Sequence, residues 1–290
     1  MKLLRFGPIG HEKPGLLDSD GVLRDLSGHI DDISGEALSP ASLARLAAIA
    51  PASVPRVEGS PRLGVPVSPI GKFIAIGLNY SDHAAEANMP IPAEPIIFTK
   101  AISCLCGPND DVVLPKGAEK GDWEVELGVF IGRTARSVAV GRALDYVAGY
   151  CVVNDVSERA WQLERGSQWD KGKGFDTFGP TGPWMVTADE VGDPQALGMF
   201  LDINGKRMQQ GTTRTMIFGV RELVAYVSSC MTLHPGDLLI TGTPPGVGMG
   251  IKPHPVYLKP GDTMHLGIDR LGEQRQRVIA WRQDLHGEGA

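Results

Sequence analysis

From residue 72 onward the sequence is divided into short apolar runs, most of them β-branched and each ended by glycine, proline or polar turn residues. Runs of this length and composition are typical of β-strands. Helical spacing of apolar residues is rarer and is clearest over residues 220–230. The pattern predicts an α+β, mainly β domain, and no glycine-rich nucleotide-binding loop opens a helix. The main predicted strands are 72–80, 94–100, 122–132, 146–155, 183–187, 199–205, 237–243 and 263–268.

The first 70 residues are predicted to form a small N-terminal domain. Residues 1–6 read as a strand and residues 15–26 as a hairpin, and a helix is expected over 39–50, after a Ser-Pro start. The proline-rich stretch 51–69 is expected to be an extended connector, since proline at that density blocks regular pairing. We therefore place a domain boundary near residue 70, with residues 71–290 as the second domain.

The composition excludes several classes of protein. Apolar residues make up 42% and charged residues 21%, and 28 basic against 34 acidic residues give a net charge of −6. Such a chain lacks the basic surface that binds nucleic acid or anionic membranes. No apolar stretch approaches the roughly 18 residues of a membrane span, and the N-terminus does not resemble a secretory signal. A cytoplasmic protein with reduced thiols is expected, and the cysteine spacing disfavours a zinc site.

The stretch 121–130, GDWEVELGVF, places acidic residues at every second position. On a strand, Asp122, Glu124 and Glu126 would share one face. Closely spaced carboxylates either raise the pKa of one member or bind a hard cation, whereas an isolated Glu-x-Glu is usually a solvated surface. The apolar run that follows favours a buried strand. Asp155, directly after another apolar strand, is the best third ligand, and three carboxylates with waters would suit Mg²⁺ or Mn²⁺.

Several motifs in a fixed order resemble the fumarylacetoacetate hydrolase superfamily over roughly residues 70–282. This resemblance implies a mixed β-roll or sandwich with peripheral helices, a small N-terminal domain and assembly as a homodimer. The motifs are GLNYSDHAAE (77–86), FTK (98–100), DWEVELGVFIG (122–132), DYVAGYCVVNDVSERAWQ (145–162), KGKGFDTFGPTGPW (171–184) and ITGTPPGVG (240–248).

The resemblance also implies roles for the acidic cluster and for a catalytic pair. Glu124, Glu126 and Asp155 match the metal ligands of the family, whereas Asp122 matches no ligand position. His83 and Glu86 lie three residues apart, so on a helical turn they share a face, and in similar proteins such a pair activates a water. An isolated pair with this spacing would ordinarily lie on a helix surface.

Further residues match positions that face the substrate in similar proteins. Lys173, rather than nearby Lys171, matches the lysine that stabilises a developing enolate or binds a carboxylate. Four residues are expected to bind substrate, with purely structural roles as the alternative: Arg159, Gln162, Thr243 and Lys100.

The function implied is metal-dependent hydrolysis of a C–C bond in a 2,4-dioxo acid of the acylpyruvate type, giving pyruvate and a second carboxylic acid. The sequence is most similar to members that act on 2,4-diketo-3-deoxy-fuconate or -rhamnonate. The alternatives are decarboxylation of an oxaloacetate-like acid, isomerisation of a hydroxy-dienoate, ureidoglycolate lyase activity, and metal or sugar-acid binding without catalysis.

Overall fold

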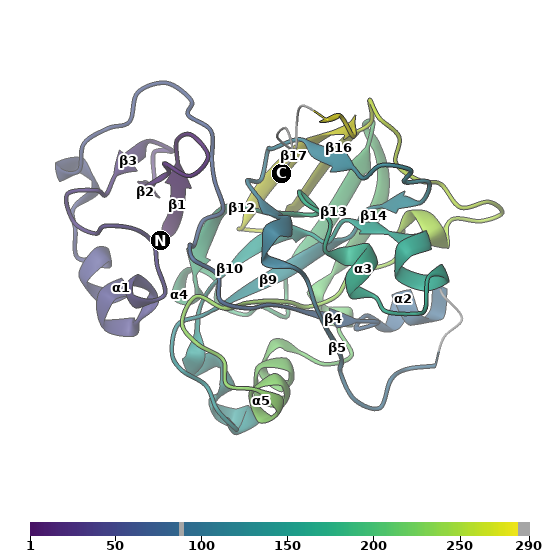
Figure 1. Cartoon of the computed structure of the whole chain (residues 1–290). Helices are drawn as coiled ribbons and strands as arrows, with labels where there is room; N and C mark the ends of the chain where they lie inside the picture. The colour runs from purple at the N-terminus through teal and green to yellow at the C-terminus, as the bar shows by residue number, and fades with distance from the viewer. Residues whose placement is uncertain (87–89, 284–290) are drawn as a thin grey trace.

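The computed structural model describes residues 1–86 and 90–283, and its fold is strand-dominated α+β (Figure 1). A ten-stranded sheet has the order β3-β2-β1-β12-β10-β9-β15-β4-β5, with β6 paired to β12. Its strands are β1 Lys2–Phe6, β2 Lys13–Leu17, β3 Leu23–Asp25, β4 Phe73–Gly77, β5 Ile96–Thr99, β6 Leu105–Cys106, β9 Val125–Ile131, β10 Val147–Asn154, β12 Gly179–Thr187 and β15 Leu238–Ile240.

A second, five-stranded sheet has the order β14-β13-β16-β17-β7 and packs on the centre of the first, where β17 contacts β10 and β12. Its strands are β7 Val112–Leu114, β13 Gly198–Ile203, β14 Lys206–Thr212, β16 Thr263–Ile268 and β17 Gly272–Ala280. The short pair β8 (Gly121–Asp122) and β11 (Ser157–Glu158) forms a third sheet. Every residue of β9 and β10 is buried, because both faces of these strands are covered.

Helices lie at the periphery of the sheets (Figure 1). The α-helices are α1 Pro40–Ala47, α2 Ser81–Glu86, α3 Asp170–Lys173, α4 Ala188–Val191 and α5 Val220–Cys230. A π-helix spans Ala160–Glu164, and short 3-10 helices span Glu36–Leu38, Pro51–Ser53, Ile102–Cys104, Val140–Tyr146, Thr213–Thr215 and Gly248–Gly250. Within the described part of the chain, no helix is long and apolar enough to cross a membrane.

The N-terminal segment forms a lobe of three strands and α1 at one edge of the main sheet (Figure 1). Its strand β1 pairs with β12 of the central region, with Lys2 opposite Val186 and Leu3 opposite Met185. The sheet is therefore continuous across the predicted domain boundary near residue 70. That boundary stays a prediction.

Each of the apolar runs predicted as strands overlaps a strand of the structure, and α5 spans the predicted helix 220–230. The short strands β6, β7 and β11 were not predicted, and neither were the longer strands β14 and β17, in which polar residues alternate with few apolar ones. The predicted strand 122–132 is broken into β8 and β9, which belong to different sheets. All four cysteines are free, and Cys104, Cys106 and Cys151 are buried.

Candidate metal centre and active site

Antiparallel pairing of β9 with β10 brings two glutamates and an aspartate together. Glu126 lies in β9 opposite Val153, and Asp155 directly follows the end of β10. The Asp155 N–H donates to the Glu124 carbonyl at 2.8 Å, which fixes the two chains where the strands part. Carboxylate oxygens of Glu124, Glu126 and Asp155 consequently lie within 4.8 Å of one another, and all three residues are buried.

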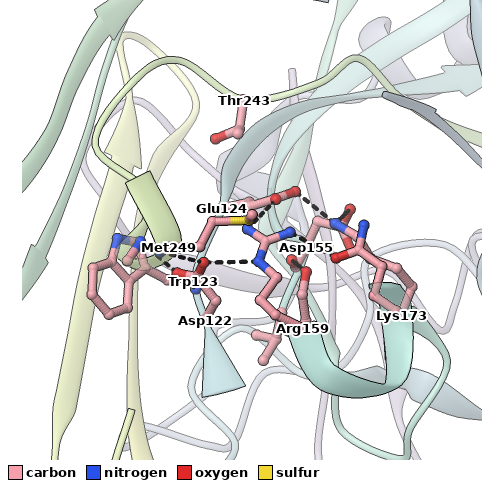
Figure 2. Close-up of polar contacts among 12 residues, drawn as sticks. Asp122, Trp123, Glu124, Asp155, Arg159, Lys173, Thr243 and Met249 are labelled. Carbon is pink, nitrogen blue, oxygen red and sulfur yellow. Dashed lines mark hydrogen bonds and ion pairs between the residues drawn. The ribbon is translucent and has the colours of Figure 1, made fainter. Parts of the chain in front are cut away.

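Two buried lysines compensate part of this negative charge. Lys173 Nζ lies 2.7 Å from both Glu124 Oε2 and Asp155 Oδ2 (Figure 2). Lys100 Nζ lies 2.6 Å from Asp155 Oδ1 and also donates to the Lys173 carbonyl. Burial lowers the pKa of Lys173, but the charges of Asp155 and Glu124 outweigh that effect and raise it above its usual value. Lys173 is therefore a charged group in the middle of the cluster.

The pKa values of Glu124 and Glu126 are shifted in opposite directions. Burial by itself would raise the pKa of Glu124, but Lys173 and Arg159 hold it far below its usual value. Burial and the charges of Asp155 and Glu124 raise the pKa of Glu126 well above its usual value. Among the described residues, no basic group lies within 4 Å of the Glu126 carboxylate. A divalent cation among the three carboxylates would remove this repulsion, so the donor set fits a hard divalent metal.

Arg159 links the cluster to Asp122, the acidic residue that matches no metal-ligand position of the family. Its Nη2 lies 2.6 Å from Glu124 Oε1 and its Nε lies 2.8 Å from Asp122 Oδ2 (Figure 2). Its Nη1 donates to Gln162 Oε1 at 2.9 Å, because the π-helix after Arg159 turns Gln162 back toward it. Arg159 and Gln162 both line the cavity described below, and Asp122 does not.

The predicted catalytic pair lies on α2. His83 Nδ1 is 3.1 Å from Glu86 Oε2, and both side chains line the cavity. The N–H of Gly246 donates to Glu86 Oε1 at 3.1 Å, which ties the helix to the loop after β15. Burial by itself would raise the pKa of Glu86, but the hydrogen bonds from His83 and Gly246 hold it below its usual value. An ionised Glu86 beside the imidazole holds the ring of His83 in one orientation.

The short helix α3 decides which of two neighbouring lysines reaches the carboxylates. Lys173 is buried, whereas Lys171 is exposed and donates to the carbonyl of Arg165. The close approach of α3 depends on Gly172, where an added Cβ would lie 2.5 Å from Gln162 N. Lys173, and not Lys171, therefore contacts the carboxylates, and its role toward a substrate stays a prediction.

Thr243 and Lys100, both predicted to bind substrate, are placed differently. Thr243 lines the cavity, but its hydroxyl donates to the Val125 carbonyl at 2.9 Å and accepts from Gln209 Nε2 at 2.8 Å. Lys100 is buried behind Asp155 and is not among the lining residues. Its ammonium group is used to hold Asp155 in place. Substrate binding by either residue stays a prediction.

A cavity of about 310 Å³ joins Glu124 and Glu126 to the predicted catalytic pair, whereas Asp155 is fully buried and does not line it. Its other walls are mainly apolar and include Phe98, Trp169 and Met249, with Lys252 at one side. The ring of Trp169 packs over Gly77, where an added Cβ would lie 2.4 Å from it. The sequence reasoning did not single out these residues. The one available signal was the spacing of Trp169 four residues before Lys173, which places both on one helical face.

A β-rich fold that places Glu124, Glu126, a buried lysine and a His–Glu pair around one cavity, with Asp155 directly behind the two glutamates, defines a class of enzyme with a candidate carboxylate metal centre. The family model "Fumarylacetoacetate (FAA) hydrolase C-terminal" matches residues 72–279. The chain belongs to the fumarylacetoacetate hydrolase family. It is 67% identical, over 95% of this chain and 98% of the relative, to a Burkholderia ambifaria protein described only in general terms as a hydrolase.

Solved structures of related enzymes have the same fold. Fumarylacetoacetate hydrolase of Exiguobacterium antarcticum is 34% identical with a TM-score of 0.84, over 97% of this chain and 100% of that one. Maleylpyruvate hydrolase of Sphingobium sp. SYK-6, solved with manganese(II) and pyruvate, is 31% identical with a TM-score of 0.81 over the same shares. The 5-carboxymethyl-2-hydroxymuconate delta-isomerase of Mycobacterium smegmatis is 31% identical with a TM-score of 0.75, over 98% and 100%. The similar proteins thus include both hydrolases and an isomerase.

Proposed function

We propose that this protein is a metal-dependent hydrolase that cleaves the C–C bond of a 2,4-dioxo acid and releases pyruvate and a second carboxylic acid. The observation that carries the proposal is that two residues of the carboxylate cluster, Glu124 and Glu126, line the same cavity as Lys173 and the His83–Glu86 pair. A cation site alone would serve binding. A base within the same cavity supplies what hydrolysis needs in addition.

Glu124, Glu126 and Asp155 are the residues that would hold the metal. Three carboxylates suit Mg²⁺ or Mn²⁺, since both prefer oxygen ligands. When bound, a divalent cation of this kind polarises oxo and carboxylate oxygens and stabilises negative charge that develops on them. The similar maleylpyruvate hydrolase was solved with manganese(II) and pyruvate, which supports a divalent metal and a pyruvate-like ligand here.

The side chains around the cavity supply the remaining steps. His83 accepts a proton from water, and Glu86 holds the ring in place. The activated water attacks the C4 carbonyl carbon, and the bond between C3 and C4 then breaks. The electron pair of that bond stays with the pyruvate half as an enolate, beside the Lys173 ammonium group. Return of the proton from His83 to C3 of the enolate then gives pyruvate and leaves His83 as it began. Arg159 and Gln162, which share the same wall, are suited to hold the substrate carboxylate.

The sequence resemblance favours a 2,4-diketo-3-deoxy sugar acid as the substrate. We also carry forward the predictions of a homodimer and of a cytoplasmic location, with neither nucleic acid nor membrane as a partner. The main competitor is a reaction without an attacking water, namely decarboxylation of an oxaloacetate-like acid or isomerisation of a hydroxy-dienoate. The similarity to an isomerase supports this second class of reaction as the alternative.

A pyruvate-release assay with a panel of 2,4-dioxo acids tests the proposal. We expect release with Mg²⁺ or Mn²⁺ and none with excess chelator. His83→Ala should reduce hydrolysis by about 10²–10⁴-fold, since it removes the base. Decarboxylation or isomerisation that survives His83→Ala would favour the competing reactions. Binding of the dioxo acids without any turnover would leave only a binding protein.

A further inference from the structure

Asp122 is completely buried and does not line the cavity, yet its carboxylate accepts hydrogen bonds from both sides of the site. Its Oδ2 accepts from Arg159 Nε at 2.8 Å and from the N–H of Met249 at 3.1 Å (Figure 2). Its Oδ1 accepts from the N–H of Gly248 at 2.6 Å and from the N–H of Trp123 at 2.8 Å. We propose that Asp122 is a positioning residue that fixes Arg159 and the loop 246–249 relative to each other.

The first half of this role is the orientation of a guanidinium group. Asp122 and Glu124 hold Nε and Nη2 of Arg159, and Gln162 accepts from Nη1. A planar guanidinium held by two carboxylates in this way has little rotational freedom. Without Asp122, Glu124 would be the only carboxylate paired with Arg159 among the described residues. The full charge of the arginine would then lie against a residue of the acidic cluster.

The second half of the role concerns the loop after β15. The Asp122 carboxylate accepts hydrogen bonds from two backbone N–H groups of this loop, those of Gly248 and Met249. The Trp123 Nε1 donates to the Gly246 carbonyl at 3.1 Å. The fit is tight, because an added Cβ at Gly248 would lie 2.8 Å from Asp122 Oδ1. From the other side, the Gly246 N–H donates to Glu86. The loop thus lies between Asp122 and the catalytic pair.

Asp122 therefore connects the part of the cavity assigned to the substrate carboxylate with the loop that contacts Glu86. The inference rests on the proposed function only where it takes Arg159 as a group that holds the substrate carboxylate. A merely structural Asp122 would affect folding but not the way in which Arg159 contributes to binding. The coupling between Asp122 and Arg159 is the quantity that separates the two roles.

The experiment measures the dissociation constants of pyruvate and oxalate by calorimetry with Mg²⁺ present, and that of Mg²⁺ alone. The variants are Asp122→Asn, Arg159→Met and the double variant. Trp123→Phe is the control, because it removes another side-chain hydrogen bond to the loop and leaves the Asp122–Arg159 pair unchanged. Thermal unfolding of each variant reports on folding.

We expect Asp122→Asn to weaken oxo-acid binding on the order of tenfold, as for the loss of a buried charge-assisted hydrogen bond. In the Arg159→Met background the same change should have almost no effect. Trp123→Phe should lower the melting temperature but leave oxo-acid binding within about twofold. Equal weakening by Asp122→Asn and Trp123→Phe, or additive effects of Asp122→Asn and Arg159→Met, would overturn the proposal.

Two further measurements keep this test decisive. If Asp122→Asn does not fold, Asp122→Glu retains the charge with a displaced carboxylate, and it should also weaken binding through Arg159. Absence of pyruvate release by the wild-type protein would count against the proposed function and leave the binding measurements interpretable. If the wild-type protein binds neither probe, crystal structures of the wild type and the folded variant decide. Arg159 and the loop 246–249 in unchanged positions would overturn the proposal.

Discussion

The carboxylate cluster and the His83–Glu86 pair share one cavity but are held in it in different ways. The cluster lies at the ends of long central strands, and buried cations such as Lys173 and Lys100 contact it directly. The pair lies on the six-residue helix α2, and its side chains keep 14% and 26% of their surface exposed. The loop contact from Gly246 to Glu86 is the main polar tie of this pair to the rest of the site.

This difference fits the roles that we propose for the two regions. A cation site requires several like charges to be held close together against their repulsion, and only a rigid, buried framework can do so. A base that takes a proton from water has to remain accessible to that water. The comparison predicts that changes in the cluster alter both stability and activity, whereas changes in the pair alter mainly activity and its pH dependence.

The largest effect is expected for Glu126→Gln. This variant keeps the shape of the side chain but removes the carboxylate that has no cationic partner within the described part of the chain. Hydrolysis should fall about a thousandfold or more, because the metal loses a charged ligand. In the presence of chelator, however, thermal stability should rise, by roughly 2–4 °C for each ~1 kcal/mol of repulsion removed.

Differential scanning fluorimetry with and without Mn²⁺ measures the stability effect, and the exposed Glu36→Gln is the matched control. The wild-type melting temperature should rise with Mn²⁺, whereas that of Glu126→Gln should hardly change. A metal response of Glu126→Gln as large as that of the wild type would show that Glu126 is not a ligand.

The next largest effect is expected for Lys173→Met. This change removes the cation between Glu124 and Asp155 and leaves two buried carboxylates with less compensation. Loss of one partner from a buried ion-pair network typically costs about 3–5 kcal/mol of stability. Urea unfolding of the metal-free protein measures this cost, and the exposed Lys171→Met is the control. An equal, small loss for both variants would contradict the view that ion pairs hold the cluster together.

The contrast between the two regions also explains how much the sequence predicts. The apolar runs identify β9 and β10, and the spacing of Glu124 and Glu126 with a strand-end aspartate identifies the cluster. These signals are local. The partners of Asp122, by comparison, include Gly248 at a separation of 126 residues, and no local pattern indicates such a contact. The break between β8 and β9 that directs Asp122 away from the cluster depends on those distant partners as well.

The same reasoning accounts for Lys100 and for the unpredicted strands. A lysine at the end of an apolar strand is ordinarily exposed, and only the fold shows that Lys100 is buried against Asp155. Strand β14 pairs with β13, and β17 pairs with β16 and β7. Because this pairing stabilises both strands, their own sequences show little of the apolar alternation that predicts a strand. The family motifs, which occur in a fixed order along the chain, indicate which residues belong to the site. The physical pattern of the sequence alone does not provide this information.

The smallest effect is expected for Glu86→Gln, and it concerns the pH dependence of stability. The pKa of Glu86 is lowered in the folded protein, whereas in the unfolded chain it should be near the usual value of about 4.3. A carboxylate with a lowered pKa stabilises the folded state above its unfolded pKa, and this contribution is lost as the pH falls through the folded pKa. The wild type should thus be more stable than Glu86→Gln at neutral pH, and the difference should shrink below about pH 4.

Urea unfolding of both proteins between pH 7 and pH 3 measures this difference, with Glu36→Gln again as the control for an exposed carboxylate. Because Glu86 is partly exposed, the effect should be small compared with that of Lys173→Met. A stability difference that stays constant down to pH 3 would mean that the Glu86 charge does not contribute to folding. The His83–Glu86 pair would then be held by the backbone of α2 and by hydrogen bonds that an uncharged amide can also make, such as the one from Gly246.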